Sequence, residues 1–295
     1  NLKYKSFIDF STDLIGPWAG YFVGWTYWLC WITIGIADLS AIIYYLQFFN
    51  NGLPFSPIEG AMISVAAIFF ILGLNLVTVK LFGELEFWFA LIKVIAILGL
   101  IVGGAILIYT GATTDAGAMT FANLWQNGGW FPNGTSGFIL SFQMVVFAFT
   151  GIELVGLTAG ETENPKKVIP QAINNIPIRI IIFYVGALAV IMSIYPWTVV
   201  SPSSSPFVQV FTVAGITAAA AIVNFIVLTS AASACNSGLF STSRMVYTLA
   251  REGNAPHMMF RLRSNHVPMN AVVFSALVIF IAVVLQYIMP ESVFV

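Results

Sequence analysis

Residues 85–109 read LEFWFALIKVIAILGLIVGGAILIY, a run of 25 positions in which only Glu86 and Lys93 carry charge. An α-helix rises 1.5 Å per residue, and about 20 apolar residues cross the hydrocarbon core of a bilayer. The stretch therefore predicts one membrane-spanning helix. Lys93 follows Glu84 by nine residues, a rise of roughly 14 Å, which places its ammonium group too deep to reach a membrane surface easily.

Six further segments have the same apolar character, and the whole chain is 59% hydrophobic and only 8% charged. A soluble domain carries about 25% charged residues, so this composition excludes a soluble surface. We therefore expect an all-α polytopic membrane protein with about seven transmembrane helices. The expected spans are residues 16–47, 57–79, 85–109, 137–157, 176–199, 207–244 and 268–289.

The first and sixth of these spans are longer than a straight crossing requires, which tilt, a helical extension or a break would each explain. In the sixth span, Gly215 and the small-residue run 230–238 are the candidate break points. Between the fourth and fifth spans, residues 160–170 form a compact polar connection whose charges we interpret as solvated anchors and gate-closing partners. We expect Pro170 in the first turn of the helix that follows.

The positions of lysine and arginine predict the orientation of the chain. All of them except Lys93 fall in the N-terminal lead, in the even-numbered connections between spans, or at the span ends that border those connections. Because cytoplasmic loops of membrane proteins are enriched in these residues, we expect Asn1 in the cytoplasm of a bacterial cell and Val295 outside its inner membrane. The net charge is −1, and no basic patch suggests a nucleic-acid partner.

Neither the cysteines nor the histidines suggest chemistry. Cys30 and Cys235 both lie within apolar segments, where thiols usually serve packing. His257 and His266 share one connection without cysteine or carboxylate at ligand spacing. We therefore expect no metal, no cofactor and no enzymatic activity. The chain starts at Asn1 and stops just after a span, so we expect a piece of a longer protein.

The fourth span carries the acidic residue Glu153 close to Thr150 and Gly151, in a short and weakly helical stretch. A helix broken here would expose the carbonyl groups of Phe147, Ala148 and Thr150, which must face protein, water or ligand at this depth. Unwound backbone in mid-membrane is typical of substrate sites in transporters, and carbonyls suit an ammonium group. The alternative is an unbroken helix in which Glu153 bonds a neighbour.

Three more polar positions within spans are candidates for function. Lys93 could release its proton during a transport cycle, fill the place of a sodium ion in a carbonyl cage, or bridge helices as a fixed cation. Asp38 lines a water-filled pocket or bonds a neighbouring helix. Asn236 lies in the small-residue run 230–239, which is either a tight helix contact or a pocket wall.

Three stretches resemble the amino acid permeases of the amino acid–polyamine–organocation superfamily: FTGIELVGLTAGETENPKKVIP at residues 149–170, FGELEFWFALIK at 82–93 and NSGLFSTSRM at 236–245. The resemblance extends through essentially the whole chain. It implies twelve helices in a five-plus-five inverted repeat, of which this chain would cover helices three to nine. The glycine-rich break of helix one, which holds the substrate carboxylate in the family, would lie outside it.

The resemblance also implies roles for individual residues. The carbonyls of Phe147, Ala148 and Thr150 would bind the substrate ammonium, and the ring of Phe147 would close over the ligand. Glu153 matches a glutamate linked to substrate and proton, and Lys93 matches a lysine proposed to replace sodium. The remaining matches border the pocket: Gly35 and Asp38 on one helix, and Gly238 where some members carry a large aromatic residue.

Within the family, GWTYW at 24–28, GGWFP at 128–132 and NIPIRI at 175–180 look most like members that carry D-serine, D-alanine and glycine. The expected function is therefore proton symport of small neutral amino acids, with L-alanine as a further candidate, by alternating access in a lipid bilayer. The alternatives are a permease for aromatic, basic or 4-aminobutyrate substrates, a channel or receptor-like bundle, and a membrane-embedded enzyme. The residues predict no oligomeric state.

Overall fold

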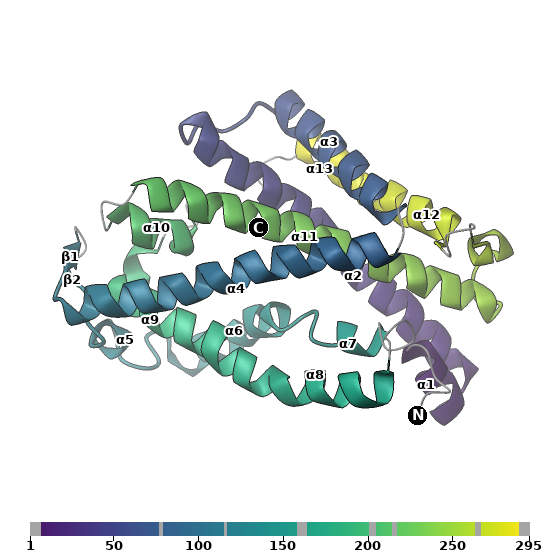
Figure 1. The fold of residues 1–295 in the computed structure, drawn as a ribbon, viewed down its shortest axis with the longest axis horizontal. Helices are drawn as coiled ribbons and strands as arrows, with labels where there is room; N and C mark the ends of the chain where they lie inside the picture. Colours follow the sequence, from purple (N-terminus) through teal and green to yellow (C-terminus); the bar gives the residue numbers. More distant parts are fainter. Residues whose placement is uncertain are drawn as a thin grey trace. The chain divides into compact units, whose positions relative to one another are not determined.

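The computed structural model describes residues 7–76, 79–114, 117–157, 164–200, 205–213, 217–262 and 267–288. Apart from one hairpin of two-residue strands, its regular structure is helical, so the predicted all-α class is confirmed (Figure 1). The chain separates into two compact units, which are described one at a time. Unit 1 comprises Asn1–Leu91, Gly156–Thr162 and Val227–Val295, and unit 2 comprises Ile92–Val155 and Glu163–Ile226.

Unit 1 consists of long apolar helices and short connecting turns. In chain order these are α1 (Phe7–Leu14), α2 (Pro17–Gln47), η1 (Phe48–Asn50), α3 (Pro57–Asn75), the first part of α4 (Val79–Tyr109), the later part of α11 (Thr217–Arg251), η5 (His257–Phe260), α12 (Met269–Ile279) and α13 (Ile281–Ile288). Helix α3 starts at Pro57 because Ser56 caps it: the Ser56 hydroxyl accepts the Glu59 amide N–H, and the Glu59 carboxylate accepts the Ser56 amide N–H. Helices α3 and α13 lie side by side (Figure 1).

The core of unit 1 lies where α1, α2, α11 and α12 meet. The Trp28 indole N–H donates to the Ser275 hydroxyl at 3.1 Å, and its ring stacks on Phe274 at 5.5 Å. This hydrogen bond satisfies the one polar group of an otherwise buried tryptophan. Gly24 allows a close approach, since a Cβ there would lie 2.7 Å from a methyl group of Leu249.

Unit 2 contains the remaining helices and the hairpin. They are the later part of α4, β1 (Thr113–Thr114), β2 (Gly117–Ala118), α5 (Asn123–Gln126), α6 (Gly134–Ala148), the start of α7 (Leu154–Leu157), α8 (Pro165–Ile180), the π-helix η3 (Ile181–Gly186), α9 (Ala187–Ile194), η4 (Trp197–Val199), α10 (Pro206–Val213) and the start of α11. The strands are antiparallel, with Thr113 opposite Ala118. The Ser193 carbonyl at the end of α9 accepts from Thr120 N and from Asn123 Nδ2, which fixes this extended segment to the helix.

Helices α4 and α9 approach closely at Gly104, where a Cβ would overlap Val190 Cγ1. We expect Gly104→Ala to destabilise the protein by about 1–3 kcal/mol, because the added methyl must push the two helices apart. Gly103→Ala is the matched control, since nothing lies within 4 Å of its Cβ position. Thermal unfolding in detergent measures the difference, and equal melting temperatures for the two variants would contradict the close contact.

Helices occupy all seven predicted segments. Five are long and apolar enough to cross a membrane, including Pro165–Ile194 and Ala218–Arg251, and two shorter apolar helices, Gly134–Ala148 and Met269–Leu285, account for the fourth and seventh segments. Two details were predicted wrongly. Helix α11 continues without a break through residues 230–238, because its small side chains fit a buried helix contact. Helix α8 starts at Pro165, so Pro170 lies inside it rather than in its first turn. The other candidate break point, Gly215, lies outside the described residues.

A charged cluster attaches α1 to the end of α11 in unit 1. Arg251 Nη2 lies 2.6 Å from Asp9 Oδ1, and the Thr12 hydroxyl donates to Glu252 Oε2 at 3.4 Å. Burial, a hydrogen bond with Asp9 and the negative charge of Asp9 raise the pKa of Glu252 above its ordinary value of 4.5, and Arg251 opposes this shift. The protonated form of Glu252 is therefore the one that the folded cluster favours.

This raised pKa predicts how the attachment of α1 depends on pH. The stabilisation of the α1 attachment by Glu252 is fully present below pH 4.5. It is lost as the pH rises through the raised pKa of Glu252, because a second carboxylate charge then develops beside Asp9. Hydrogen exchange of the α1 amides, corrected for the intrinsic effect of pH, should show decreasing protection over that window. Glu252→Gln should remove the dependence, and a wild-type protection that stays constant would show that Glu252 does not titrate there.

Candidate functional site

The fourth apolar segment is interrupted after its first helix. Helix α6 ends at Ala148, α7 begins at Leu154, and Gly151 between them has a φ of 102°. Residues with a side chain rarely adopt this backbone conformation, whereas glycine does so at little cost. The Glu153 carboxylate accepts the Gly151 amide N–H at 2.8 Å and so satisfies a backbone donor that the interruption releases. The predicted break is confirmed.

The carbonyl groups of this interruption already take part in hydrogen bonds. The Tyr184 hydroxyl donates to the Ala148 carbonyl at 2.7 Å, and the Thr150 amide N–H donates to the Phe147 carbonyl at 3.1 Å. Two of the three carbonyls that we expected to be bare therefore have a protein donor. A carbonyl oxygen has two lone pairs, so each can still accept a second hydrogen bond.

Tyr184 is a site residue that the sequence analysis missed. It lies in η3, a π-helix, and its ring stacks on Phe149 with a centroid distance of 5.0 Å. π-helical turns within α-helices frequently occur at functional sites. The available signal was a single hydroxyl-bearing residue in the otherwise apolar run IIFYVG at 181–186, but its partner is 36 residues away in the chain.

Removal of this hydroxyl should loosen the interruption. We expect Tyr184→Phe to preserve the ring stack and to lower the free energy of unfolding by about 0.5–1.5 kcal/mol, because one hydrogen bond contributes about that much. Tyr109→Phe is the control, since Tyr109 is 93% exposed. The measurement is thermal unfolding in detergent. Equal melting temperatures for both variants would show that the Tyr184 hydroxyl does not support the interruption.

The other predicted site residues divide between the units. Lys93 lies on α4 in unit 2, as the interruption does, and is half-buried. Gly35 and Asp38 lie on α2 in unit 1. Gly35 is buried, and a Cβ there would lie 3.1 Å from Ile279 Cδ1, so the structure gives it a packing role against α12. Its carbonyl faces the Cys235 thiol at 3.8 Å.

Gly238 marks another close approach in unit 1. A Cβ at this position would lie 3.0 Å from the ring of Trp31, which is 5% exposed. A large aromatic side chain at position 238 would therefore need the space that Trp31 takes. Gly238 thus leaves the space that the ring of Trp31 on α2 occupies.

Asn236 is buried in a polar network rather than in a purely apolar contact. Its side-chain amide donates to Glu86 Oε1 at 2.9 Å, and its side-chain oxygen accepts from Asn75 Nδ2 at 2.7 Å. The Ser233 hydroxyl donates to Glu86 Oε2 at 2.7 Å. Asn75 and Glu86 were missed, because both lie near the ends of predicted spans, where polar residues are ordinary.

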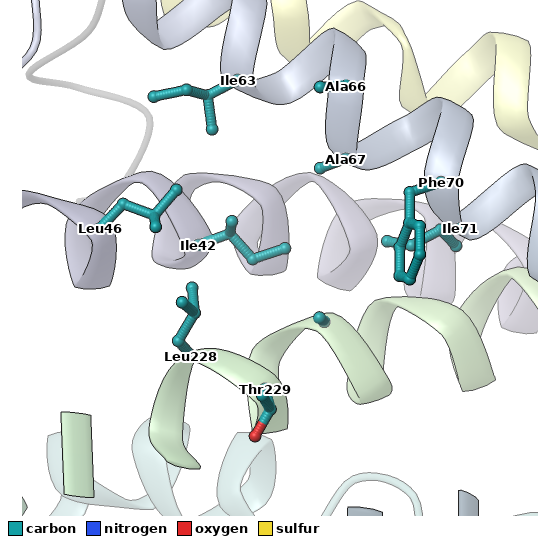
Figure 2. Close-up of a pocket in the computed structure, with 10 residues that line it drawn as sticks. Ile42, Leu46, Ile63, Ala66, Ala67, Phe70, Ile71, Leu228 and Thr229 are labelled. Atoms are coloured by element: carbon teal, nitrogen blue, oxygen red, sulfur yellow. The ribbon is translucent and has the colours of Figure 1, made fainter. Parts of the chain in front are cut away.

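Unit 1 also has an open groove whose walls are apolar, in contrast to this polar network. Its volume is about 460 Å³, and α2, α3 and α11 supply its walls (Figure 2). Thr229 is the one lining residue with a polar side chain, so the groove does not suit a zwitterion. None of the predicted substrate residues lines it. The walls consist of Ile42, Leu46, Ile63, Ala66, Ala67, Phe70, Ile71, Leu228, Thr229 and Ala232.

The comparisons with known proteins concern the chain as a whole. The family model described as amino acid permease matches residues 1–295. The uncharacterized transporter YdgF and the amino-acid permease AapA, both of Bacillus subtilis strain 168, are 63% and 60% identical over 100% of this chain and 63% of their own length. The D-serine/D-alanine/glycine transporter of Escherichia coli K12 is 53% identical over 99% of this chain and 61% of its own length.

The chain thus spans about three-fifths of the length of the relatives that it matches. Its apolar helices and its family both identify a multi-pass membrane protein, of a family of transporters rather than enzymes. The family model covers the interruption at Gly151, the lysine of α4 and the buried network alike. By this match over its full extent, the chain belongs to the amino acid permease family.

Proposed function

We propose that this chain forms a large part of a proton-coupled importer of small neutral amino acids. The observation that carries the proposal is the interruption between Ala148 and Leu154 within an apolar segment. Interrupted helices at mid-membrane bind substrate in many secondary transporters, because their backbone groups can face a polar ligand. The printed name of the Escherichia coli relative supports glycine, D-alanine and D-serine as substrates, and L-alanine is a further candidate.

In this proposal the substrate enters as a zwitterion. Its ammonium group bonds the second lone pairs of the Phe147 and Ala148 carbonyls and the carbonyl of Thr150, and Phe147, whose side chain is 56% exposed, closes over it. The substrate carboxylate binds to a part of the longer protein that this chain does not contain.

Proton coupling would depend on Lys93 and Glu153. A proton drives accumulation only if proton and substrate each favour the state that binds the other, which is a reciprocal free energy between the two sites. Glu153 is bonded directly to the Gly151 amide, so its protonation would change the hydrogen bonding of the interruption. Lys93 places an ammonium group within an apolar helix. Loss or gain of a proton by this group would have a large electrostatic effect there.

The excess of lysine and arginine in alternate connections supports an orientation with Asn1 in the cytoplasm and Val295 outside a bacterial inner membrane.

The full-length permease that contains this chain would test the function in liposomes. We expect labelled D-alanine to accumulate against its gradient under an imposed proton gradient, and a protonophore to abolish the accumulation.

Competition then defines the substrate class. Glycine, D-serine and L-alanine should compete with labelled D-alanine, and phenylalanine, lysine and 4-aminobutyrate should not. Competition by one of the second group would favour a permease for that substrate. Flux without accumulation would favour a channel-like bundle and would contradict the proposal.

A further inference from the structure

The polar network of unit 1 centres on the carboxylate of Glu86. Both of its oxygens accept a hydrogen bond from α11: Oε1 from the Asn236 amide at 2.9 Å and Oε2 from the Ser233 hydroxyl at 2.7 Å. Asn75, at the end of α3, donates to Asn236 Oδ1 at 2.7 Å and to the Ile71 carbonyl at 3.1 Å. Three helices therefore contribute oxygen-bearing side chains to one place.

The network contains more hydrogen-bond acceptors than donors. Asn75 is 6% exposed, and its side-chain oxygen Oδ1 is buried without a hydrogen-bond partner among the described residues. Asn236 and Ser233 are 1% and 2% exposed, so water reaches them poorly. A buried acceptor without a donor is costly, and native structures usually supply a partner for it. Asn75 Oδ1 therefore lacks a hydrogen-bond donor or a cation as its partner.

The charge of Glu86 also lacks a counterion among the described side chains. Its two hydrogen-bond donors, the Asn236 amide and the Ser233 hydroxyl, are neutral, and neither of the ion pairs seen at Arg251 includes Glu86. An anionic group at low polarity is costly unless a cation accompanies it. The Glu86 carboxylate thus lacks a cation and Asn75 Oδ1 lacks a donor, and one bound cation would satisfy both groups.

The titratable groups on the neighbouring helices do not supply this charge. On α3 the one such residue is Glu59, which lies in the first turn, at the end away from Asn75. On α11 the nearest are Cys235, whose thiol faces α2 and interacts with Asp38 there, and Arg244, whose guanidinium lies 3.1 Å over the ring of Phe240. The described titratable groups of α3 and α11 therefore do not pair with Glu86, which leaves a cation from solution as the candidate partner.

We propose that Glu86, Ser233, Asn236 and Asn75 form a binding site for one alkali cation, Na⁺ or K⁺. All the ligands that they offer are oxygens, which hard cations prefer, and one carboxylate charge matches one monovalent ion. The carboxylate of Glu86 is the anionic ligand. The Ser233 hydroxyl oxygen and Asn75 Oδ1 are neutral ligands, and Asn236 orients both Glu86 and Asn75. The site is distinct from Lys93 and from the interruption at Gly151, and it does not depend on the proposed transport activity.

Binding is measured without transport on the purified full-length permease that contains this chain, in lipid nanodiscs, so the result stands whether or not the protein is an importer. We expect about one ²²Na⁺ per chain, displaced by unlabelled sodium or potassium chloride but not by choline chloride. Sodium or potassium should raise the melting temperature above that in choline at equal ionic strength, because a ligand that binds only the folded state stabilises it. Competition between the two salts identifies which ion binds more tightly.

Glu86→Gln should weaken ²²Na⁺ binding by about tenfold or more, because the site loses its charge. The matched control is Glu59→Gln. Glu59 also accepts a serine hydroxyl, from Ser56 at 2.8 Å, but is exposed at a helix start. Binding in this control should equal that of the wild type. Retained binding in Glu86→Gln, or equal stabilisation by choline and sodium in the wild type, would overturn the proposal.

A second variant keeps the test decisive if Glu86→Gln does not fold. Asn75→Asp has the same shape and places a second carboxylate where the unpartnered oxygen lies. We expect tighter ²²Na⁺ binding and a larger sodium-dependent rise in melting temperature than in the wild type. An unchanged or smaller effect of sodium in Asn75→Asp would contradict the assignment of Asn75 as a ligand and of the cluster as a cation site.

Discussion

Gly151→Ala should lower uptake by about ten- to hundredfold in the full-length permease that contains this chain. Gly151 has a φ of 102°, and a side chain in such a conformation costs about 1–3 kcal/mol, of which each 1.4 kcal/mol is a factor of ten. The variant would relieve this strain by a rearrangement of residues 149–153. This rearrangement would displace the Gly151 amide, whose N–H donates a hydrogen bond to the Glu153 carboxylate. It would also displace the carbonyl groups that we propose to bind the substrate.

Gly73→Ala is the matched control for this experiment. Gly73 lies within α3, and nothing lies within 4 Å of its Cβ position, so alanine should be tolerated. Initial rates of labelled D-alanine uptake, normalised to the amount of protein in the membrane, compare the two variants. Equal rates would show that the backbone conformation at Gly151 is not needed for transport, and the importer proposal would lose the observation that carries it.

Lys93→Ala should abolish most of the proton-driven accumulation while exchange of substrate across the membrane continues. A coupling free energy of 1–3 kcal/mol corresponds to a factor of about 5–150. The accumulation ratio of Lys93→Ala should therefore be lower than that of the wild type by a factor in this range. Counterflow at equal concentrations needs only the substrate site and the conformational change. It should therefore survive if Lys93 links the proton to transport without holding the substrate.

Lys167→Ala provides the comparison for Lys93, since it removes an equal charge from an exposed position in the first turn of α8. Both variants are measured in liposomes with an imposed proton gradient and again by counterflow. Unchanged accumulation in Lys93→Ala would remove this lysine from the mechanism. Loss of both activities would instead indicate a role of Lys93 in folding or in substrate binding.

Much of the fold could be predicted because the helices are determined by properties of short stretches of the chain. Apolar length alone predicts the seven helical segments, since a run such as residues 85–109 has too little charge for a soluble surface. The interruption at Gly151 was also predictable, because a glycine beside a threonine and an acid weakens a helix whatever surrounds it. The same local reasoning failed at residues 230–238. There the small side chains permit a close helix contact instead of causing a break.

The candidate site was predictable only in part. The carbonyls of Phe147 and Ala148 were identified, but their existing donors were not, and Tyr184 bonds Ala148 across 36 residues. The cluster around Glu86 was missed for a related reason. Asn236 is separated from Glu86 by 150 residues and from Asn75 by 161, and each residue by itself looks like an ordinary polar position.

The amino-acid sequence by itself determined that this protein is a helical membrane protein, which segments are helices, and where one of them is interrupted. These properties follow from hydrophobic length and from backbone preferences, which act over a few residues. The tertiary structure decided which polar groups meet: Tyr184 with Ala148, and Glu86 with Asn236 and Asn75. Hydrogen bonds between distant helices depend on how those helices pack, and no local pattern in the chain encodes that arrangement.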